Sequence, residues 1–98
     1  MSKQSSNSNI IYVGRKPPMN YVLAIVTAFS GAEVKEVTVK ARGQAITTAV
    51  DAVEIARRKF VKEMVADKIA IGTEEMPPRE GESNSRNIST IEITLKRS

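Results

Sequence analysis

The chain has 98 residues, 41% of them apolar, and carries 15 Lys and Arg against 11 Asp and Glu, a net charge of +4. This length is typical of one small domain with a core of its own. The sequence contains no cysteine and no histidine. This excludes disulfides, thiolate or imidazole metal sites, and Ser-His-Asp or Cys-His catalytic sites. We therefore expect a protein that is not an enzyme and has no cofactor or metal.

The excess positive charge lies in the first half of the chain. Residues 1–49 have a net charge of +4, whereas residues 50–98 are balanced. Such asymmetry favours a polyanionic partner. The first eight residues are polar and lack the apolar core of a signal peptide. We therefore expect a disordered tail at 1–8, a single domain at 9–98, and an intracellular protein without a membrane span.

Apolar periodicity predicts six elements in the order β-α-β-α-β-β. Strand-like runs rich in Ile and Val alternate with two stretches whose apolar residues recur at helical spacing. A segment dense in Pro, Gly, Ser and Asn separates the last two strands and predicts a long loop. The predicted elements are a strand at 9–13, a helix at 19–30, a strand at 33–41, a helix at 44–65, a strand at 68–76, a loop at 77–87 and a strand at 88–96.

Chain connectivity then predicts the architecture. A β-α-β crossover makes its two strands parallel, so the first three strands run the same way and the fourth returns antiparallel. The fold class is α/β of the two-layer α+β kind, with two helices on one face of a four-stranded mixed sheet.

The same reasoning predicts where the positive charge gathers. The carboxyl ends of the three parallel strands lie at one end of the sheet, and each is followed by a turn that carries cations. Helices that begin at these turns point free backbone N–H groups the same way, which suits an anion. Pro17 and Pro18 make the approach to the first helix rigid. Any one basic turn is ordinary solvated surface, but three together predict a polyanion site. These cations are Arg15, Lys16, Lys40, Arg42, Arg79 and Arg86.

Two aromatic residues leave alternatives open. Tyr21 either packs in the core or stacks on a base near the basic end. Phe60 lies on the apolar stripe of the second helix, either in the core or as an exposed anchor for another subunit. A nuclease would need carboxylates clustered at the cationic end. Asp51, Glu54 and Glu63 lie further along the second helix, and Glu80 and Glu82 lie on a flexible loop.

Three segments resemble the Alba family of archaeal chromatin proteins: VGRKPPMNYVLAIVTAF, KARGQAITTAVDAVEIARRKF and STIEITLK. The resemblance spans residues 10–96 and implies the β-α-β-α-β-β fold derived above. It also implies a homodimer that coats double-stranded DNA with little sequence preference, compacts the chromosome and binds RNA. Such a protein is cytoplasmic and chromosome-associated.

The resemblance also implies roles for single residues. The turns matching Arg15–Lys16 and Lys40–Arg42 lie on the DNA backbone, and an extended β-hairpin at 77–87, with Arg79 and Arg86, reaches the minor groove. Phe60 matches an aromatic at contacts between dimers. Many members have Arg at Gln44 and Lys at Thr48, which implies lower affinity here. Lys16 is a possible acetylation site, whereas Arg15, where acetylated members have a second lysine, cannot accept this modification.

We therefore predict a sequence-nonspecific DNA-binding protein of chromatin that also binds RNA. The alternative is an RNA-binding protein, either an RNA chaperone or a subunit of an RNA-processing particle, in which Asn20 and Tyr21 touch unpaired bases. The candidate nucleic-acid contacts are Arg15, Lys16, Asn20, Tyr21, Lys40, Arg42, Gln44, Arg79 and Arg86.

Overall fold

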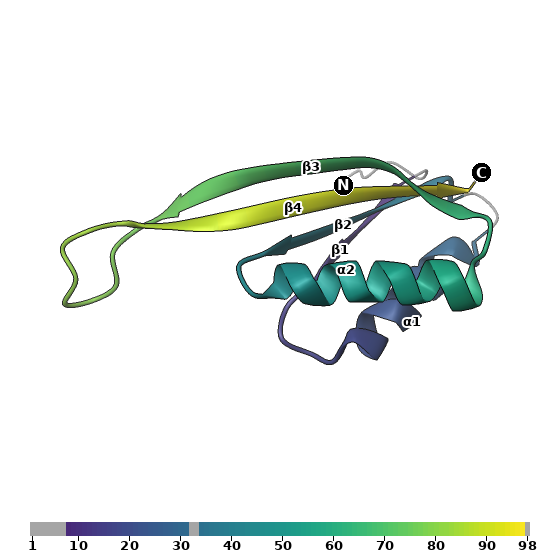
Figure 1. Ribbon diagram of the computed structural model, residues 1–98, viewed down its shortest axis with the longest axis horizontal. Helices are drawn as coiled ribbons and strands as arrows, with labels where there is room; N and C mark the ends of the chain where they lie inside the picture. Colours follow the sequence, from purple (N-terminus) through teal and green to yellow (C-terminus); the bar gives the residue numbers. More distant parts are fainter. Residues whose placement is uncertain (1–7, 32–33, 98) are drawn as a thin grey trace, which may run out of the picture.

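The computed structural model describes residues 8–31 and 34–97 (Figure 1). Two α-helices and a turn of π-helix accompany four strands in the predicted order. Residues 1–7 of the predicted polar tail lie outside the described residues. The elements are β1 (Ser8–Tyr12), α1 (Pro18–Phe29), β2 (Glu36–Arg42), α2 (Ala45–Ile55), the π-helical turn η1 (Ala56–Phe60), β3 (Met64–Met76) and β4 (Arg86–Arg97).

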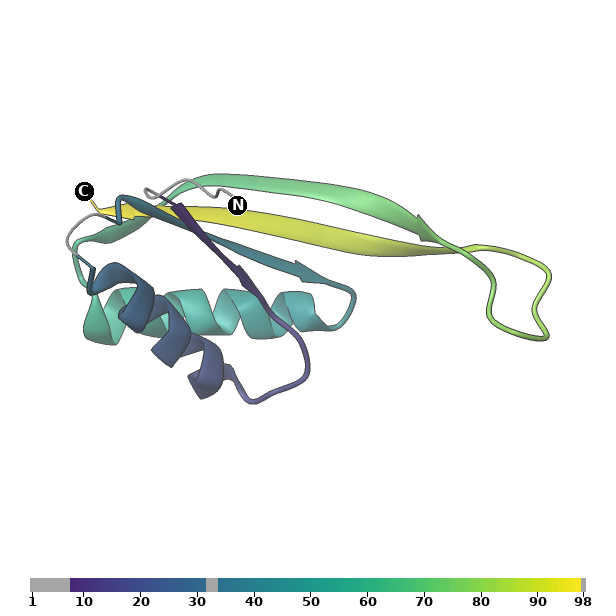
Figure 2. The same ribbon diagram turned by 180° about the vertical axis from the view of Figure 1, so that it is seen from behind.

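The four strands form one mixed sheet in the order β1-β2-β4-β3. β1 pairs with β2 in parallel, and β4 pairs antiparallel with both β2 and β3. The first three strands therefore run the same way, as predicted, although β4 lies between β2 and β3. Both helices pack on the same face of the sheet (Figures 1 and 2), which confirms the predicted two-layer fold.

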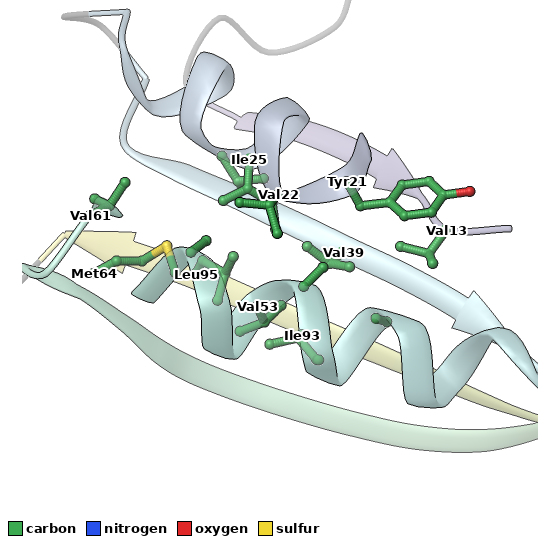
Figure 3. Packing of buried hydrophobic residues seen from close by; sticks show 14 of the residues in the cluster. Val13, Tyr21, Val22, Ile25, Val39, Val53, Val61, Met64, Ile93 and Leu95 are labelled. Atoms are coloured by element: carbon green, nitrogen blue, oxygen red, sulfur yellow. The ribbon is translucent and has the colours of Figure 1, made fainter. Parts of the chain in front are cut away.

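The core lies between the helices and this face of the sheet (Figure 3). β2 alternates strictly, so Val37 and Val39 are fully buried while the residues between them are not. Ile25 and Phe29 on α1 and Leu95 on β4 complete the centre at 0 to 1% exposure. Burial of each such side chain contributes about 1.5 to 3 kcal/mol, so the core holds the strand ends and the turns that follow them in place.

The second helix ends earlier than predicted. The spacing of apolar residues predicts a helix as far as residue 65, but α2 passes into η1, and the chain leaves the helix after Phe60. Val61 N donates to Ala56 O at 2.8 Å, a five-residue step, and Val61 itself, with φ −119° and ψ 81°, is no longer helical. Met64 still reaches the core, 1% exposed, but from the start of β3. Spacing alone cannot distinguish a helical position from a residue brought to the same core by a turn.

β3 and β4 extend well past the end of β2. Arg42, the last residue of β2, is level with Thr90 on β4 and Gly72 on β3, and the pairing continues four residues further, to Met76 and Arg86. At about 3.3 Å per residue this adds about 13 Å, and a loop at 77–85 lies beyond it. We call residues 73–89 the β3–β4 arm; it gives the molecule its elongated shape (Figure 2).

Candidate nucleic-acid interface

The hydroxyl of Tyr21 holds the turn between β1 and α1. Tyr21 is 9% exposed, and its hydroxyl oxygen accepts hydrogen bonds from the backbone N–H of Gly14 at 2.9 Å and of Lys16 at 3.1 Å. These amides flank Arg15, so the backbone on both sides of this cation is held. The side chains of Arg15 and Lys16 lie in solvent. Tyr21 thus packs in the core through its ring and positions the basic turn through its hydroxyl.

The prolines after this pair begin the helix as predicted. Pro17 is extended, with φ −60° and ψ 152°, and it accepts a bond from Asn20 N at 3.0 Å through its carbonyl oxygen. Pro18 is the first residue of α1, where a backbone N–H has no helical partner in any case. Asn20 is exposed and lines an open depression of about 480 Å³ between β1 and α1.

The second basic turn follows β2. Lys40 and Arg42 alternate with the buried Val39 and Ala41, so they point to the outer face of the sheet, away from the helices. Gly43 then takes φ +61°, which a residue with a side chain rarely adopts. Gln44 follows as the exposed residue that precedes α2, and its side chain makes no capping hydrogen bond.

These two turns are neighbours, as the chain direction predicted. Tyr12 is paired with Lys40, and Val13 N donates to Lys40 O at 2.9 Å. Arg15 therefore comes only two residues after a backbone hydrogen bond to β2. The β1–α1 turn leads toward the helix layer (Figure 2), whereas Lys40 points outward. The cations therefore wrap around one end of the sheet. We call Arg15, Lys16, Lys40 and Arg42 the basic rim.

The arm carries its two arginines beyond the basic rim. Arg86 begins β4 opposite Met76, and its buried Nε has no hydrogen-bond partner among residues 8–31 and 34–97. Arg79 lies in the loop, where its backbone N–H donates to the carboxylate of Glu82 at 3.1 Å. Arg79 and Arg86 lie at the same end of the sheet as the basic rim but further from the body of the protein, because β3 and β4 extend past the end of β2.

Two carboxylates lie on the outward-facing cations of the basic rim. Arg42 Nη1 is 2.8 Å from Glu74 Oε1, and Lys40 Nζ is 3.6 Å from Glu92 Oε2. Glu74 and Glu75 are neighbours on β3, so their side chains point to opposite faces of the sheet. Both are exposed, and Glu75 instead accepts a bond from the Ser85 hydroxyl at 2.6 Å. The contact with Arg42 was missed because it depends on a strand register that joins residues 32 positions apart.

Phe60, the residue predicted to lie at contacts between dimers, lies away from the basic rim. Phe60 ends η1 and is 51% exposed, so it is accessible to another molecule.

In the described part of the chain, no group of three or more acidic, His or Cys side chains is placed to hold a metal ion. No described helix is long and apolar enough to cross a membrane.

The fold and the basic rim define a class of small two-layer α+β protein with a cationic end and a projecting β-hairpin. A family model described as Alba matches residues 9–73, and the chain belongs to this family.

Relatives and solved structures agree with this assignment. A "DNA/RNA-binding protein Alba" of Methanocella arvoryzae is 53% identical over 91% of this chain and 90% of its own length. Another protein of that name, from Picrophilus torridus, is 48% identical over 94% of this chain and 99% of its own. The solved structure "Alba from Thermoplasma volcanium" superposes with a TM-score of 0.81 at 48% identity, covering 91% of this chain and all of that chain.

Proposed function

We propose that this protein binds nucleic acids without enzymatic activity, coats double-stranded DNA with little sequence preference, compacts the chromosome and also binds RNA. The observation that carries the proposal is the basic rim, two neighbouring turns that present four cations at one end of the sheet. The relatives' shared name, at about half identity over nearly the whole chain, gives independent support. Such a protein works in the cytoplasm, associated with the chromosome.

The proposed mechanism is electrostatic. Arg15, Lys16, Lys40 and Arg42 each neutralise a phosphate, while Asn20 and Gln44 add hydrogen bonds to the backbone or to a base. Because each neutralised phosphate releases condensed counterions, log K falls with log salt at about −0.9 per full contact, so four full contacts per chain set an upper limit of about −3.6. Contacts to phosphates carry no sequence information, which accounts for the low sequence preference.

The arm adds a second kind of contact in this proposal. Arg86 begins β4 and Arg79 lies in the loop that ends the arm. The arm is a narrow projection (Figure 1), a shape that can follow a groove away from the body of the protein. Arginines that enter the minor groove read its width and potential more than its bases. The arm therefore extends the bound length of DNA without adding strong sequence preference.

We also propose that two copies associate through β3. β3 is an edge strand of the sheet, and its residues from Val65 to Glu75 are exposed because the helices do not cover it. Ile69 and Ile71 are 59% and 83% exposed there. A second copy that covers these side chains removes both an apolar surface and an open strand edge from water. Phe60 then remains available for contacts between dimers on DNA.

The dimer is tested by mass measurement in solution. Ile71→Glu places a charge in the middle of the proposed interface, and we expect a shift from dimer to monomer in light scattering. Thr73→Glu is the matched control, since it adds the same charge to the same edge strand at the first residue of the arm. Dimers of unchanged mass for Ile71→Glu would assign the contact to another surface.

Lys16 is the proposed acetylation site. Its side chain is exposed, and acetylation removes its charge and hence one phosphate contact. Arg15 keeps its charge under the same conditions, so the proposed regulation lowers affinity only in part.

A titration against nucleic acid tests the function. The protein is added to labelled duplex DNA and to a structured RNA of equal length at several salt concentrations, beside the double variant Arg15→Ala/Lys16→Ala. We expect the double variant to bind every sequence more weakly, with the salt slope reduced by about two. Arg58→Ala/Lys59→Ala is the matched control, because it removes an exposed Arg-Lys pair from η1, away from the basic rim.

The outcomes separate the alternatives. Equal losses in both double variants would mean that net charge, not the basic rim, governs binding. If structured RNA competes strongly against duplex DNA, the RNA-binding function is the main one; the relatives' name covers both ligands. If the parent binds neither ligand, the proposal fails.

A further inference from the structure

The two halves of the basic rim differ in how free their cations are. Lys40 and Arg42 are in ion pairs with Glu92 and Glu74. Within the described residues, neither Arg15 nor Lys16 forms an ion pair. A phosphate therefore meets two cations that form no ion pair within the described residues at the first turn, and two partly neutralised cations at the second.

The arm contributes more negative than positive charge. Residues 73–89 contain four carboxylates, Glu74, Glu75, Glu80 and Glu82, against two arginines, so the arm has a net charge of −2. The rest of the chain therefore has a net charge of +6. These carboxylates weaken the attraction between the arm's two arginines and a duplex, and Glu74 forms an ion pair with Arg42.

We propose that Glu74 limits the affinity of this protein for nucleic acid by competing with phosphate for the guanidinium of Arg42. The inference rests on the proposed function and names a residue that tunes it. Only Nη1 of Arg42 contacts the carboxylate, at 2.8 Å, and the same nitrogen lies 3.9 Å from Met76 Sδ. A phosphate that engages Arg42 must displace Glu74 or lie against its negative charge.

The exposure of this pair decides how strong the competition is. The Arg42 and Glu74 side chains are 56% and 52% exposed, so a phosphate can reach the guanidinium from solvent. Exposed ion pairs are weak. Glu74 therefore lowers the affinity by a small factor and keeps binding reversible, rather than blocking the site.

The test begins with Glu74→Gln, which keeps the shape of the side chain and removes its charge. We expect Kd for duplex DNA to fall about two- to fivefold at low salt, the range of an exposed ion pair. The salt slope should steepen by up to about 0.9, because Arg42 then releases counterions as a full phosphate contact. In an Arg42→Gln background the same substitution should give no such gain.

Asp67→Asn is the matched control for net charge. Asp67 lies on the same strand as Glu74 and forms an ion pair with Lys96 at 3.4 Å, with similar exposure. Lys96 is six residues along β4 from Thr90, which is level with Arg42, a separation of about 20 Å. This exceeds the screening length of about 8 Å at physiological salt. Asp67→Asn should therefore change Kd by less than about 1.5-fold.

Three results would overturn the inference: equal gains from Glu74→Gln and Asp67→Asn, a gain that survives in the Arg42→Gln background, or weaker binding by Glu74→Gln. The last would make Glu74 a residue that positions Arg42. Melting curves of every variant establish that each is folded. A parent protein that binds no nucleic acid refutes the proposed function itself, and this outcome is distinguishable from the other three.

Discussion

Removal of the Tyr21 hydroxyl separates the two roles of this side chain. In Tyr21→Phe the ring still fills its place in the core, but Gly14 N and Lys16 N lose their common acceptor. A hydrogen bond contributes about 1 kcal/mol to stability, and less where the donor regains water. Gly14 and Lys16 are exposed, so we expect about 1 kcal/mol for both bonds together. For a domain of this size, this lowers Tm by about 5 °C.

The effect on binding follows from the lost order of the turn. Fixing the backbone of one residue costs about 1 to 2 kcal/mol. If the flexibility gained around Arg15 amounts to about 1 kcal/mol, which must be recovered on the DNA, Kd for duplex DNA rises about fivefold. The salt slope should not change, because the number of cations is unchanged. This combination distinguishes a positioning residue from a phosphate contact.

The assays are urea unfolding, DNA titration by fluorescence anisotropy, and NMR amide exchange at Gly14 and Lys16. Tyr12→Phe is the matched control, since it removes the hydroxyl of the other tyrosine in the chain, a residue that is 71% exposed. Both amides should exchange faster in Tyr21→Phe only. Unchanged exchange together with parental affinity would refute the role of the hydroxyl.

Three further predictions concern the core, a turn and an ion pair. Phe29→Ala empties a site that is 1% exposed and should lower the free energy of unfolding in urea by about 3 to 5 kcal/mol. Gly43→Ala should cost about 1 to 2 kcal/mol in the same assay, because φ is +61°; Gly14→Ala, which lacks this constraint, should change little. Two hydrogen bonds from Arg57 lower the pKa of Glu54 from its usual 4.5. A lowered pKa in the folded state adds stability that is present at neutral pH and lost as pH falls through that value. In Arg57→Gln, NMR titration should show the pKa of Glu54 returning toward 4.5.

Most of the fold could be predicted from the pattern of hydrophobic residues. Strict alternation along β2 and the apolar face of α1 are local signals, and the handedness and direction of β-α-β crossovers then follow from chain geometry. The prediction from this pattern was wrong after Phe60, because Met64 keeps the helical spacing of apolar residues but belongs to β3. A turn that returns the chain to the same core preserves the apolar spacing, so the sequence could not reveal it.

The candidate site was predictable in part for a similar reason. Chain direction alone indicated that the turn with Arg15 and the turn with Lys40 are neighbours, and the pairing of β1 with β2 agrees. Whether these side chains contact nucleic acid stays a prediction. The sequence did not reveal that Tyr21 supports the first turn. A tyrosine that only packs in the core and a tyrosine whose hydroxyl also accepts backbone hydrogen bonds are the same residue in the sequence.

The sequence by itself determined the class of fold, the family and the cations available for binding, since composition, periodicity and motifs are properties of neighbouring residues. Only the tertiary structure decided which of those cations are free. Arg42 and Glu74 meet because β4 lies between β2 and β3 and sets a register across three strands. The strength of a charged surface depends on such distances, and the distances exist only once the strands are paired.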